Sequence, residues 1–418
     1  MKHWKEVKLG DICDIIMGQS PKSEFYNNEN KGIEFLQGNK TFGIKHPIYD
    51  TYTTQITKKA LKNDIIMSVR APVGDINITT KDICIGRGLC SLRMKNNQQE
   101  FLYYLLKNYS KELQSNQNGT VFGSINKNQI FNFKVLITTN IEEQKAIAKN
   151  LSCLDEKIEL NNKINKNLEE MAQAIFKKWF IDFDYPLTDE EIANGGREFV
   201  DSELGKIPKS WRVGKLNDII YDIIGGDWGK DKVQGNYIKN VFCIRGADIP
   251  KIENGELINL PNRFIINKNF ENKKLLSNDI IIEISGGSPT QSTGRVTIIK
   301  NSILKNTPNL ICTNFCRILR SKNNFHNFMY YYLKFIYNKG VMFTYENGTT
   351  GIKNLDVKNL LEKEVLTIPD IKIIHNFNII IDAIKYKIIK SSEQNEKLAQ
   401  IRDTLLPKLI NGDVRVPY

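Results

Sequence analysis

The sequence has few of the residues that metal sites and disulfide frameworks need. Its 418 residues include four histidines, none paired at metal-ligand spacing, and seven cysteines without a CxxC spacing. These counts argue against a structural zinc site and against a disulfide-rich secreted domain. The opening residues MKHWKEVKLGD turn polar at once, and no apolar run is long enough to span a bilayer. We therefore expect a cytoplasmic protein without a membrane contact.

Catalytic motifs are missing as well. The stretch GGDWGK at 225–230 is rich in glycine but does not fit the GxxxxGK[ST] spacing of a phosphate-binding loop. No GxSxG elbow, no Asn/Asp-Pro-Pro-aromatic pocket of an amino-methyltransferase and no Pro…Asp…Glu-x-Lys nuclease cluster stands out. We predict no catalytic residue and no metal ligand in this chain. The alternative is an enzyme whose motifs have diverged, which would bind S-adenosylmethionine or a metal by itself.

What the sequence does contain is an internal repeat. WKEVKLGDICDIIMG at 4–18 corresponds to WRVGKLNDIIYDIIGG at 211–226, an offset of 207 (211 minus 4). Further on, NDIIMSV at 63–69 corresponds to NDIIIEI at 278–284, and LRMKNN at 92–97 to LRSKNN at 319–324. The growing offset is what insertions produce in divergent copies of one domain. Short β-branched and aromatic runs broken by Gly, Asn and Pro, with one helical stretch per copy, predict a strand-rich α+β domain.

Each copy also has a run of aromatic residues in its helical stretch. FLYYLL lies at 101–106 and FMYYYLKF at 328–335. Aromatic side chains can stack on nucleic-acid bases, but at helical spacing they are more often part of a hydrophobic core. We therefore expect both runs in the cores of their domains.

The charge follows the same division. The chain carries 59 Lys+Arg against 47 Asp+Glu, a formal net charge of +12. Residues 1–140 have 19 basic and 12 acidic groups, residues 211–370 have 22 and 15, and residues 141–210 between them have 10 and 15. Two basic blocks joined by an acidic stretch indicate two modules that bind a polyanion.

Each copy ends in a long segment with an apolar heptad grid. Residues 141–180 contain no Pro and no Gly, and their grid recurs 230 positions later (147 to 377) with matching spacings and a polar middle. The pattern predicts two helices of about 60 Å that pack on each other, while separate packing of each helix on its own domain stays open. The predicted helix and partner interface comprises Ile147, Leu151, Leu154, Ile158, Asn165, Leu168, Ile175, Phe176, Trp179, Phe180, Phe377, Ile381, Ile384, Ile388, Asn395, Leu398, Leu405 and Leu409.

The expected architecture is therefore α+β, with two similar globular domains separated by a pair of long antiparallel coiled-coil helices and related by a pseudo-two-fold repeat. The predicted parts are a first domain at 1–140, a central helix at 141–184, a linker at 185–210, a second domain at 211–370, and a C-terminal helix with its tail at 371–418.

The strings WKEVKLGDI, DIIMSVRAPVGD, IGRGLCSLR, IEEQKAIAKNLSCLDEKIE and LEEMAQAIFKKWFIDFD resemble the DNA-specificity subunit of type I restriction–modification systems. The resemblance implies that each domain is a target-recognition domain reading one half of a split, asymmetric DNA site. It implies that the helices set the gap between the halves. It also implies two methyltransferase subunits, which would carry S-adenosylmethionine and methylate adenine N6, and restriction subunits, which would use ATP and Mg. No cofactor is expected in this chain.

DNA binding would use Lys and Arg on phosphates and Arg, Lys, Asn or Gln at base edges. The candidate DNA-binding residues are Lys40, Lys45, Arg70, Arg87, Asn118, Thr120 and Ser124 in the first domain, and Arg245, Arg263, Arg295, Asn347, Thr349, Thr350 and Lys353 in the second. Two further alternatives are the specificity subunit of a type II-like methyltransferase/nuclease and a coiled-coil scaffold that binds proteins or polyanions without sequence preference.

Overall fold

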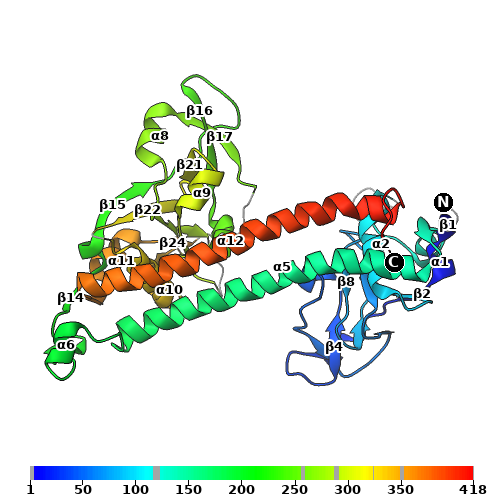
Figure 1. Cartoon of the computed structure of the whole chain (residues 1–418), viewed down its shortest axis with the longest axis horizontal. Coiled ribbons are helices and arrows are strands. Elements are labelled where there is room, and N and C mark those ends of the chain that lie inside the picture. The colour runs from blue at the N-terminus through cyan, green and yellow to red at the C-terminus, as the bar shows by residue number, and fades with distance from the viewer. Residues whose placement is uncertain are drawn as a thin grey trace. The chain divides into compact units, whose positions relative to one another are not determined.

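The computed structural model describes residues 4–115, 123–255, 259–286, 291–322, 324–348 and 353–417. The chain divides into two compact units (Figure 1). The first unit contains Met1–Ile158 with Lys397–Tyr418, and the second contains Glu159–Glu396. Each unit thus takes a part of each long helix.

The first unit is built on three sheets. A two-stranded sheet pairs β1 (Trp4–Lys8) with β11 (Lys134–Thr138). The four-stranded sheet has the order β2 (Cys13–Met17), β10 (Leu89–Met94), β7 (Ile65–Ser68) and β8 (Ile76–Ile78). The five-stranded sheet has the order β3 (Tyr26–Asn27), β5 (Tyr52–Thr53), β4 (Ile33–Leu36), β9 (Ile83–Ile85) and β6 (Lys59–Ala60). The short helices are α1 (Leu9–Ile12), α2 (Gln99–Asn108), α3 (Ser110–Ser115) and α4 (Lys127–Asn132).

The second unit repeats this plan. The two-stranded sheet pairs β14 (Arg212–Lys215) with β25 (Val365–Ile368), and the four-stranded sheet has the order β15 (Ile220–Gly225), β22 (Cys316–Ser321), β18 (Ile280–Glu283) and β20 (Val296–Ile298). Two three-stranded sheets have the orders β17 (Asn262–Ile266), β16 (Tyr237–Ile244), β21 (Leu310–Cys312) and β19 (Ser285–Gly286), β24 (Lys353–Leu355), β23 (Glu346–Asn347). Its short helices are α7 (Ile249–Glu253), α8 (Asn267–Lys273), α9 (Asn301–Asn306), α10 (His326–Asn338) and α11 (Val357–Lys363).

The repeat read from the sequence is confirmed at the level of strand register. Ile65 pairs with Leu92 in the first unit, and Ile280 pairs with Leu319 in the second. These are the counterparts that the aligned strings predict. The asparagine before each of these strands adopts a left-handed conformation with φ of 70° in both copies, a region that Asn tolerates better than most residues. The two copies therefore share backbone detail as well as topology.

The tyrosine-rich runs within α2 and α10 are core, as expected. Phe101–Leu106 are at most 2% exposed, and Phe328–Leu333 at most 8%. The helices bury these rings against the four-stranded sheets because their aromatic and apolar side chains cover most of the helix surface.

The linker predicted at 185–210 is folded. It contains α6 (Asp189–Ala193), which starts with a capping box between Thr188 and Glu191, and a hairpin of β12 (Phe199–Ser202) and β13 (Gly205–Pro208). The Arg197 guanidinium lies 3.4 Å from the centre of the Tyr185 ring and pairs with Glu191 at 2.8 Å. These contacts order a segment whose Pro, Gly and acidic composition suggested a plain connector.

The heptad segments form the two longest helices, α5 (Ile141–Phe176) and α12 (Ile371–Ile410), and a π-helical turn at Lys177–Ile181 follows α5. Most of the predicted interface is buried: Ile147, Leu151, Ile158, Asn165, Phe176, Trp179, Phe180, Phe377, Ile381, Ile384, Ile388 and Leu409. The half-buried remainder is Leu154, Leu168, Ile175, Asn395, Leu398 and Leu405.

Both ways of packing that the sequence left open occur together. In the first core, Ile147 and Leu151 of α5 pack with Leu409 of α12 and with the first domain's sheet residues. In the second core, Phe176 of α5 lies 6.2 Å from Phe377 of α12 and 5.8 Å from Phe328 of α10, measured between ring centres. The helices therefore contact each other and complete the domain cores at the same time.

The helix pair has a polar waist in the second unit. Asn161 donates to the side chains of Gln394 and Asn395, and Asn165 donates to Ser392 at 3.1 Å. Residue numbers rise on α5 as they fall on α12, so the helices are antiparallel in this unit. Paired amides in an otherwise apolar seam favour one register over others, because a shifted register would leave them without partners.

Buried ion pairs join the two helices in both units. In the first unit, Asp155 accepts hydrogen bonds from Tyr104 at 2.7 Å and from Arg402 at 2.6 Å. In the second unit, Glu169 pairs with Lys334 at 2.6 Å and with Lys385 at 2.8 Å. Burial alone would raise the pKa of Glu169, but the ammonium groups of Lys385 and Lys334 outweigh it and lower the pKa to about 2.

Replacing Glu169 with Gln should lower the free energy of unfolding of the full chain at pH 7 by about 3 kcal/mol, because two lysines then lack their buried counter-charge. The folded-state pKa is depressed, so this contribution is complete above the unfolded-state pKa of about 4.3 and declines as the pH falls toward 2. The difference between wild type and E169Q, measured by urea unfolding, should therefore shrink between pH 5 and pH 3.

The neighbouring Glu170, which is 62% exposed and lies 3.8 Å from Lys166, provides the matched control. E170Q should change the unfolding free energy by less than about 0.5 kcal/mol at either pH. Equal effects of the two substitutions would contradict a specific role for the Glu169 cluster.

Candidate nucleic-acid interface

Backbone hydrogen bonds gather several loops at one end of the four-stranded sheet in the first unit. Gln19 N donates to Ile85 O, and Gly86 N donates to Leu36 O, at 2.9 and 2.8 Å. Val69 N donates to Gly88 O, and Ile125 N donates to Val69 O, at 2.9 and 3.1 Å. We call these joined segments the first loop rim; it comprises residues 18–20, 37–38, 69–70, 86–88 and 124–125.

Glycines make this close approach possible. A Cβ atom on Gly18 would lie 2.2 Å from Gly86 O, and one on Gly88 would lie 2.5 Å from Gln37 O. A Cβ atom on Gly86 would lie 2.9 Å from the Gln37 Cα. Because the obstructing atoms belong to backbone, no side-chain movement would relieve these clashes. The close contact between loops therefore explains why glycine occupies both glycine positions of GRG in the string IGRGLCSLR.

Side chains with base-reading chemistry extend from this rim. Arg70, Arg87, Gln19 and Gln37 are exposed. Arg70 forms an isolated β-bridge with Ser124, so these two residues are adjacent. Guanidinium and carboxamide groups present donors and acceptors with the geometry of base edges in the major groove.

The second unit builds the same frame from different residues. Asp227 N donates to Cys312 O, and Thr313 N donates to Ile244 O, at 2.8 and 2.9 Å. The Ile284 amide donates to Phe315 O at 2.9 Å, and the Ile284 carbonyl accepts from Leu355 N at 2.8 Å. Each of these four bonds is the counterpart of one in the first loop rim. The second loop rim comprises residues 226–227, 245, 284–285, 313–315 and 354–355.

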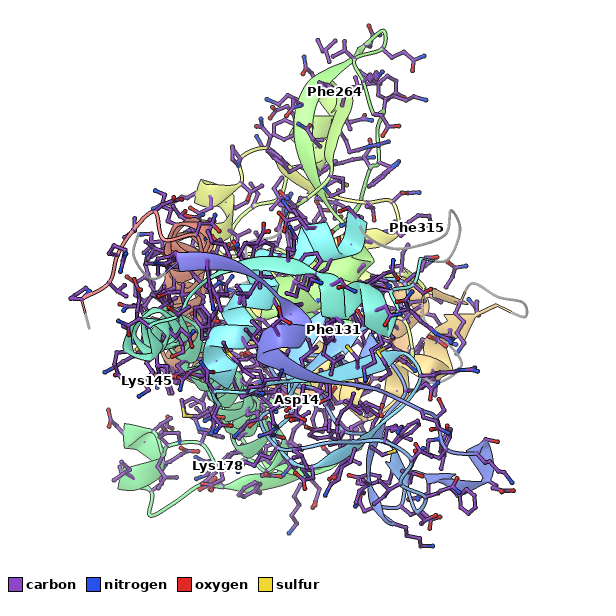
Figure 2. The ribbon with its side chains drawn as sticks, turned by 90° about the vertical axis from the view of Figure 1, so that its right-hand side faces the viewer. Asp14, Phe131, Lys145, Lys178, Phe264 and Phe315 are labelled. Atoms are coloured by element: carbon purple, nitrogen blue, oxygen red, sulfur yellow. The ribbon has the colours of Figure 1, made fainter. Side chains whose placement is uncertain are left out.

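On this common frame the exposed side chains differ. Ser285 takes the place of Arg70, and Asn314 takes the place of Arg87, as the backbone bonds align them. Phe315, which is 55% exposed, stands where the first rim has Gly88, and Figure 2 labels it. The two rims therefore offer different chemical patterns from equivalent positions.

The second unit also has a basic hairpin, β16–β17, on which Phe264 is labelled in Figure 2. Two cations lie over aromatic rings around it: Lys230 over Tyr237 and Lys239 over Phe270, at 5.6 and 4.5 Å. Cation–π contacts hold the cationic side chains in place, which favours a preorganised basic surface.

Comparison with known proteins supports one family. Residues 1–170 match the type I restriction modification DNA specificity domain. The MjaX type I specificity subunit of Methanocaldococcus jannaschii is 39% identical over 176 residues, 41% of this chain and 41% of that one. The MjaIX specificity subunit of the same organism is 28% identical across 99% of this chain and 94% of its own length. The crystal structure of the type I S subunit from Mycoplasma genitalium has a TM-score of 0.57 at 19% identity, covering 97% of this chain and 96% of that one.

Residues 1–170 thus carry the type I restriction modification DNA specificity domain, and nearly the whole chain is similar to type I specificity subunits. Its fold is the one predicted, with two α+β domains and long helices, as the likeness to the M. genitalium subunit shows. Among the helices within the described ranges, none is long and apolar enough to cross a membrane. In the same ranges, no group of three or more His, Cys, Asp or Glu could hold a metal ion.

Several sequence-predicted residues lie on or beside the rims, most of them exposed. Arg70, Arg87 and Ser124 come together on the first rim, with exposed Lys40 in the short helix that follows residue 38. Arg245 lies exposed on the second rim, although Asp248 holds its guanidinium at 2.9 Å. Asn347 and Lys353 lie on the adjacent β23 and β24, where Lys353 pairs with Glu346 at 3.0 Å. Their contact with DNA stays a prediction.

Three predicted residues are instead buried or half-buried and paired with acids. Lys45 is 6% exposed and pairs with Glu100 at 3.3 Å. Arg295 forms two hydrogen bonds with Glu283, at 2.8 and 2.5 Å, and Arg263 is 7% exposed between Trp228 and Asp231. Acids of the same domain already neutralise these cations, so they are not positioned to meet a phosphate. Asn118, Thr120, Thr349 and Thr350 lie outside the described residues.

Sequence reasoning missed Gln19, Gln37, Asn314 and Phe315. Aligning IGRGLCSLR at 85–93 with CTNFCRILR at 312–320, a constant offset of 227, would have set Arg87 against Asn314. Nothing in the sequence marked Gln19 or Gln37, because their role depends on loops that meet only in the fold.

Gly18→Ala should lower the unfolding free energy by about 2 kcal/mol, because the added methyl group must displace the Gly86 carbonyl. Gly38→Ala is the control: its Cβ would meet nothing within 4 Å, and its φ of −166° suits any residue. Thermal unfolding of both variants tests the explanation. A Gly18→Ala protein as stable as Gly38→Ala would refute the close approach.

Proposed function

We propose that this chain is the sequence-specific double-stranded DNA-binding subunit of a type I restriction–modification complex. Each domain reads one half of a split, asymmetric site. The observation that carries the proposal is that two loop rims share one hydrogen-bonded frame but present different side chains. Two copies of one reading domain with different contact residues suit a site whose halves differ in sequence.

Recognition would combine two kinds of contact. Lysines and arginines of the basic domains neutralise phosphates, which sets affinity and its salt dependence but carries no sequence information. On the first rim, the Arg87 guanidinium matches guanine O6 and N7. On the second, the Asn314 amide matches adenine N6 and N7, and the Phe315 ring suits a thymine methyl group.

Catalysis belongs to partner subunits in this proposal. The chain would bind two methyltransferase subunits, which carry S-adenosylmethionine and modify adenine N6, and restriction subunits that use ATP and Mg. Its own contribution is to place those subunits at the site and to fix the gap between the half-sites through α5 and α12. Half-site spacing follows from the distance and rotation between two reading domains.

Co-expression with an adenine methyltransferase partner and mapping of methylated adenines across the host genome tests the reading role. A two-part adenine motif should appear only when both proteins are present. If an active partner methylates the same sites without this chain, the specificity role fails. If the active pair yields no motif, a non-specific scaffold becomes the better description.

Substitutions on the rims should act on one half of the motif each. Arg87→Ala should weaken methylation at sites with the preferred base by roughly 10-fold to 100-fold, about 1–3 kcal/mol, and relax one position in one half only. Asn314→Ala should do the same in the other half. Lys134→Ala, at an exposed β11 lysine that pairs with Glu6, is the control and should leave the motif unchanged. If Arg87→Ala changed both halves of the methylated motif, the proposal that each domain reads one half would be contradicted.

A further inference from the structure

The apolar residues of the helix pair do not distinguish α5 from α12. Their grids coincide at an offset of 230, so Ile147, Leu151 and Ile158 correspond to Phe377, Ile381 and Ile388, all of them buried. A second copy of the chain could therefore offer its own α5 in the place of α12. Apolar packing alone would permit two chains to exchange helices.

Two contacts of the polar waist do not distinguish them either. Asn165 donates to Ser392 at 3.1 Å, and Asn395 donates to Asn162 at 2.8 Å. These contacts are equivalent, because 165 plus 230 is 395 and 162 plus 230 is 392. If α5 met a second α5, Asn165 would find an Asn162 side chain in the same position. These two contacts fix a register without choosing a partner.

The buried charges do differ between the helices. Asp155 and Lys385 occupy equivalent positions, 230 residues apart, and are 3% and 5% exposed. Asp155 pairs with Arg402 of α12 at 2.6 Å, and Lys385 pairs with Glu169 of α5 at 2.8 Å. In both pairs the acid is on α5 and the base is on α12.

This arrangement makes like helices repel. In a pair of α5 helices, Asp155 of one copy would take the place of Lys385 and face Glu169 of the other. In a pair of α12 helices, Lys385 of one copy would take the place of Asp155 and face Arg402 of the other. Each conflict would occur twice in a symmetric dimer, among groups largely removed from water. Like charges in a buried site are strongly unfavourable because water cannot screen them.

We propose that these buried charges select α12 as the partner of α5 and exclude a dimer in which like helices of two copies of this chain pair. Each helix pair then joins one first domain to one second domain, and never two copies of the same domain. This selection concerns assembly alone and does not depend on DNA recognition.

The full-length double variant Asp155→Arg with Lys385→Glu tests the proposal. Within one chain, the introduced arginine would face Arg402 and the introduced glutamate would face Glu169, while both pairings with a second copy become complementary. Wild type should have the mass of one chain by size-exclusion chromatography with light scattering, and the double variant should have the mass of two. The control, Glu156→Arg with Lys387→Glu, makes the same charge changes at nearby exposed positions and should retain the mass of one chain.

A folded double variant with the mass of one chain would overturn the proposal, and so would a wild-type dimer in which like helices pair. If the double variant aggregates, a neutral variant decides: D155N, E169Q, K385Q and R402Q combined. Tagged and untagged copies of the neutral variant, expressed together, should co-purify at least 10-fold more than wild-type copies do. Equal co-purification of neutral and wild-type copies would overturn the proposal in that case.

Discussion

Completion of each domain core by both long helices is the constraint on which the rest of the structure depends. Leu406, Leu409 and Ile410, at the end of the chain, are buried with residues of the first domain, whose sequence begins some four hundred positions earlier. Ala172, Phe176 and Phe180 of the central segment are buried with the second domain. A domain that borrows helices in this way cannot form its full core alone. The helices are therefore structural parts of the domains as well as elements that connect them.

The loop rims show how one scaffold can carry two specificities. Their backbone hydrogen bonds are the same in both copies. The backbone therefore fixes the positions of the exposed side chains, whichever residues occupy them. The frame has Arg87 at this position in the first copy and Asn314 in the second. The backbone bonds are the same in both, because neither side chain holds the loops together. Where glycine carries the frame, as at Gly18, such freedom is absent. The division between fixed backbone and variable side chain lets the two copies present different chemistry from equivalent positions.

Charge has two separate roles in this chain. Exposed Lys and Arg residues give both domains a basic surface suited to a polyanion. Buried pairs such as Asp155–Arg402 and Glu169–Lys385 act inside the helix pair, where water screens them poorly. Lys45 and Arg295 illustrate the difference. Both belong to the basic total of the sequence, yet each is neutralised by an acid of its own domain.

The sequence by itself determined the repeat, the α+β class, the two long helices and the resemblance to type I specificity subunits, because these depend on periodicity and on recognisable strings. It could also tell that the tyrosine-rich helices are core. Only the tertiary structure decided which basic residues are available to a partner, that the linker is folded, and that Gln37, Arg87 and Ser124 share one rim. Exposure and proximity depend on contacts between segments far apart in the chain. Neither composition nor local spacing records such contacts, so the acid that pairs with buried Lys45 could be found only in the folded molecule.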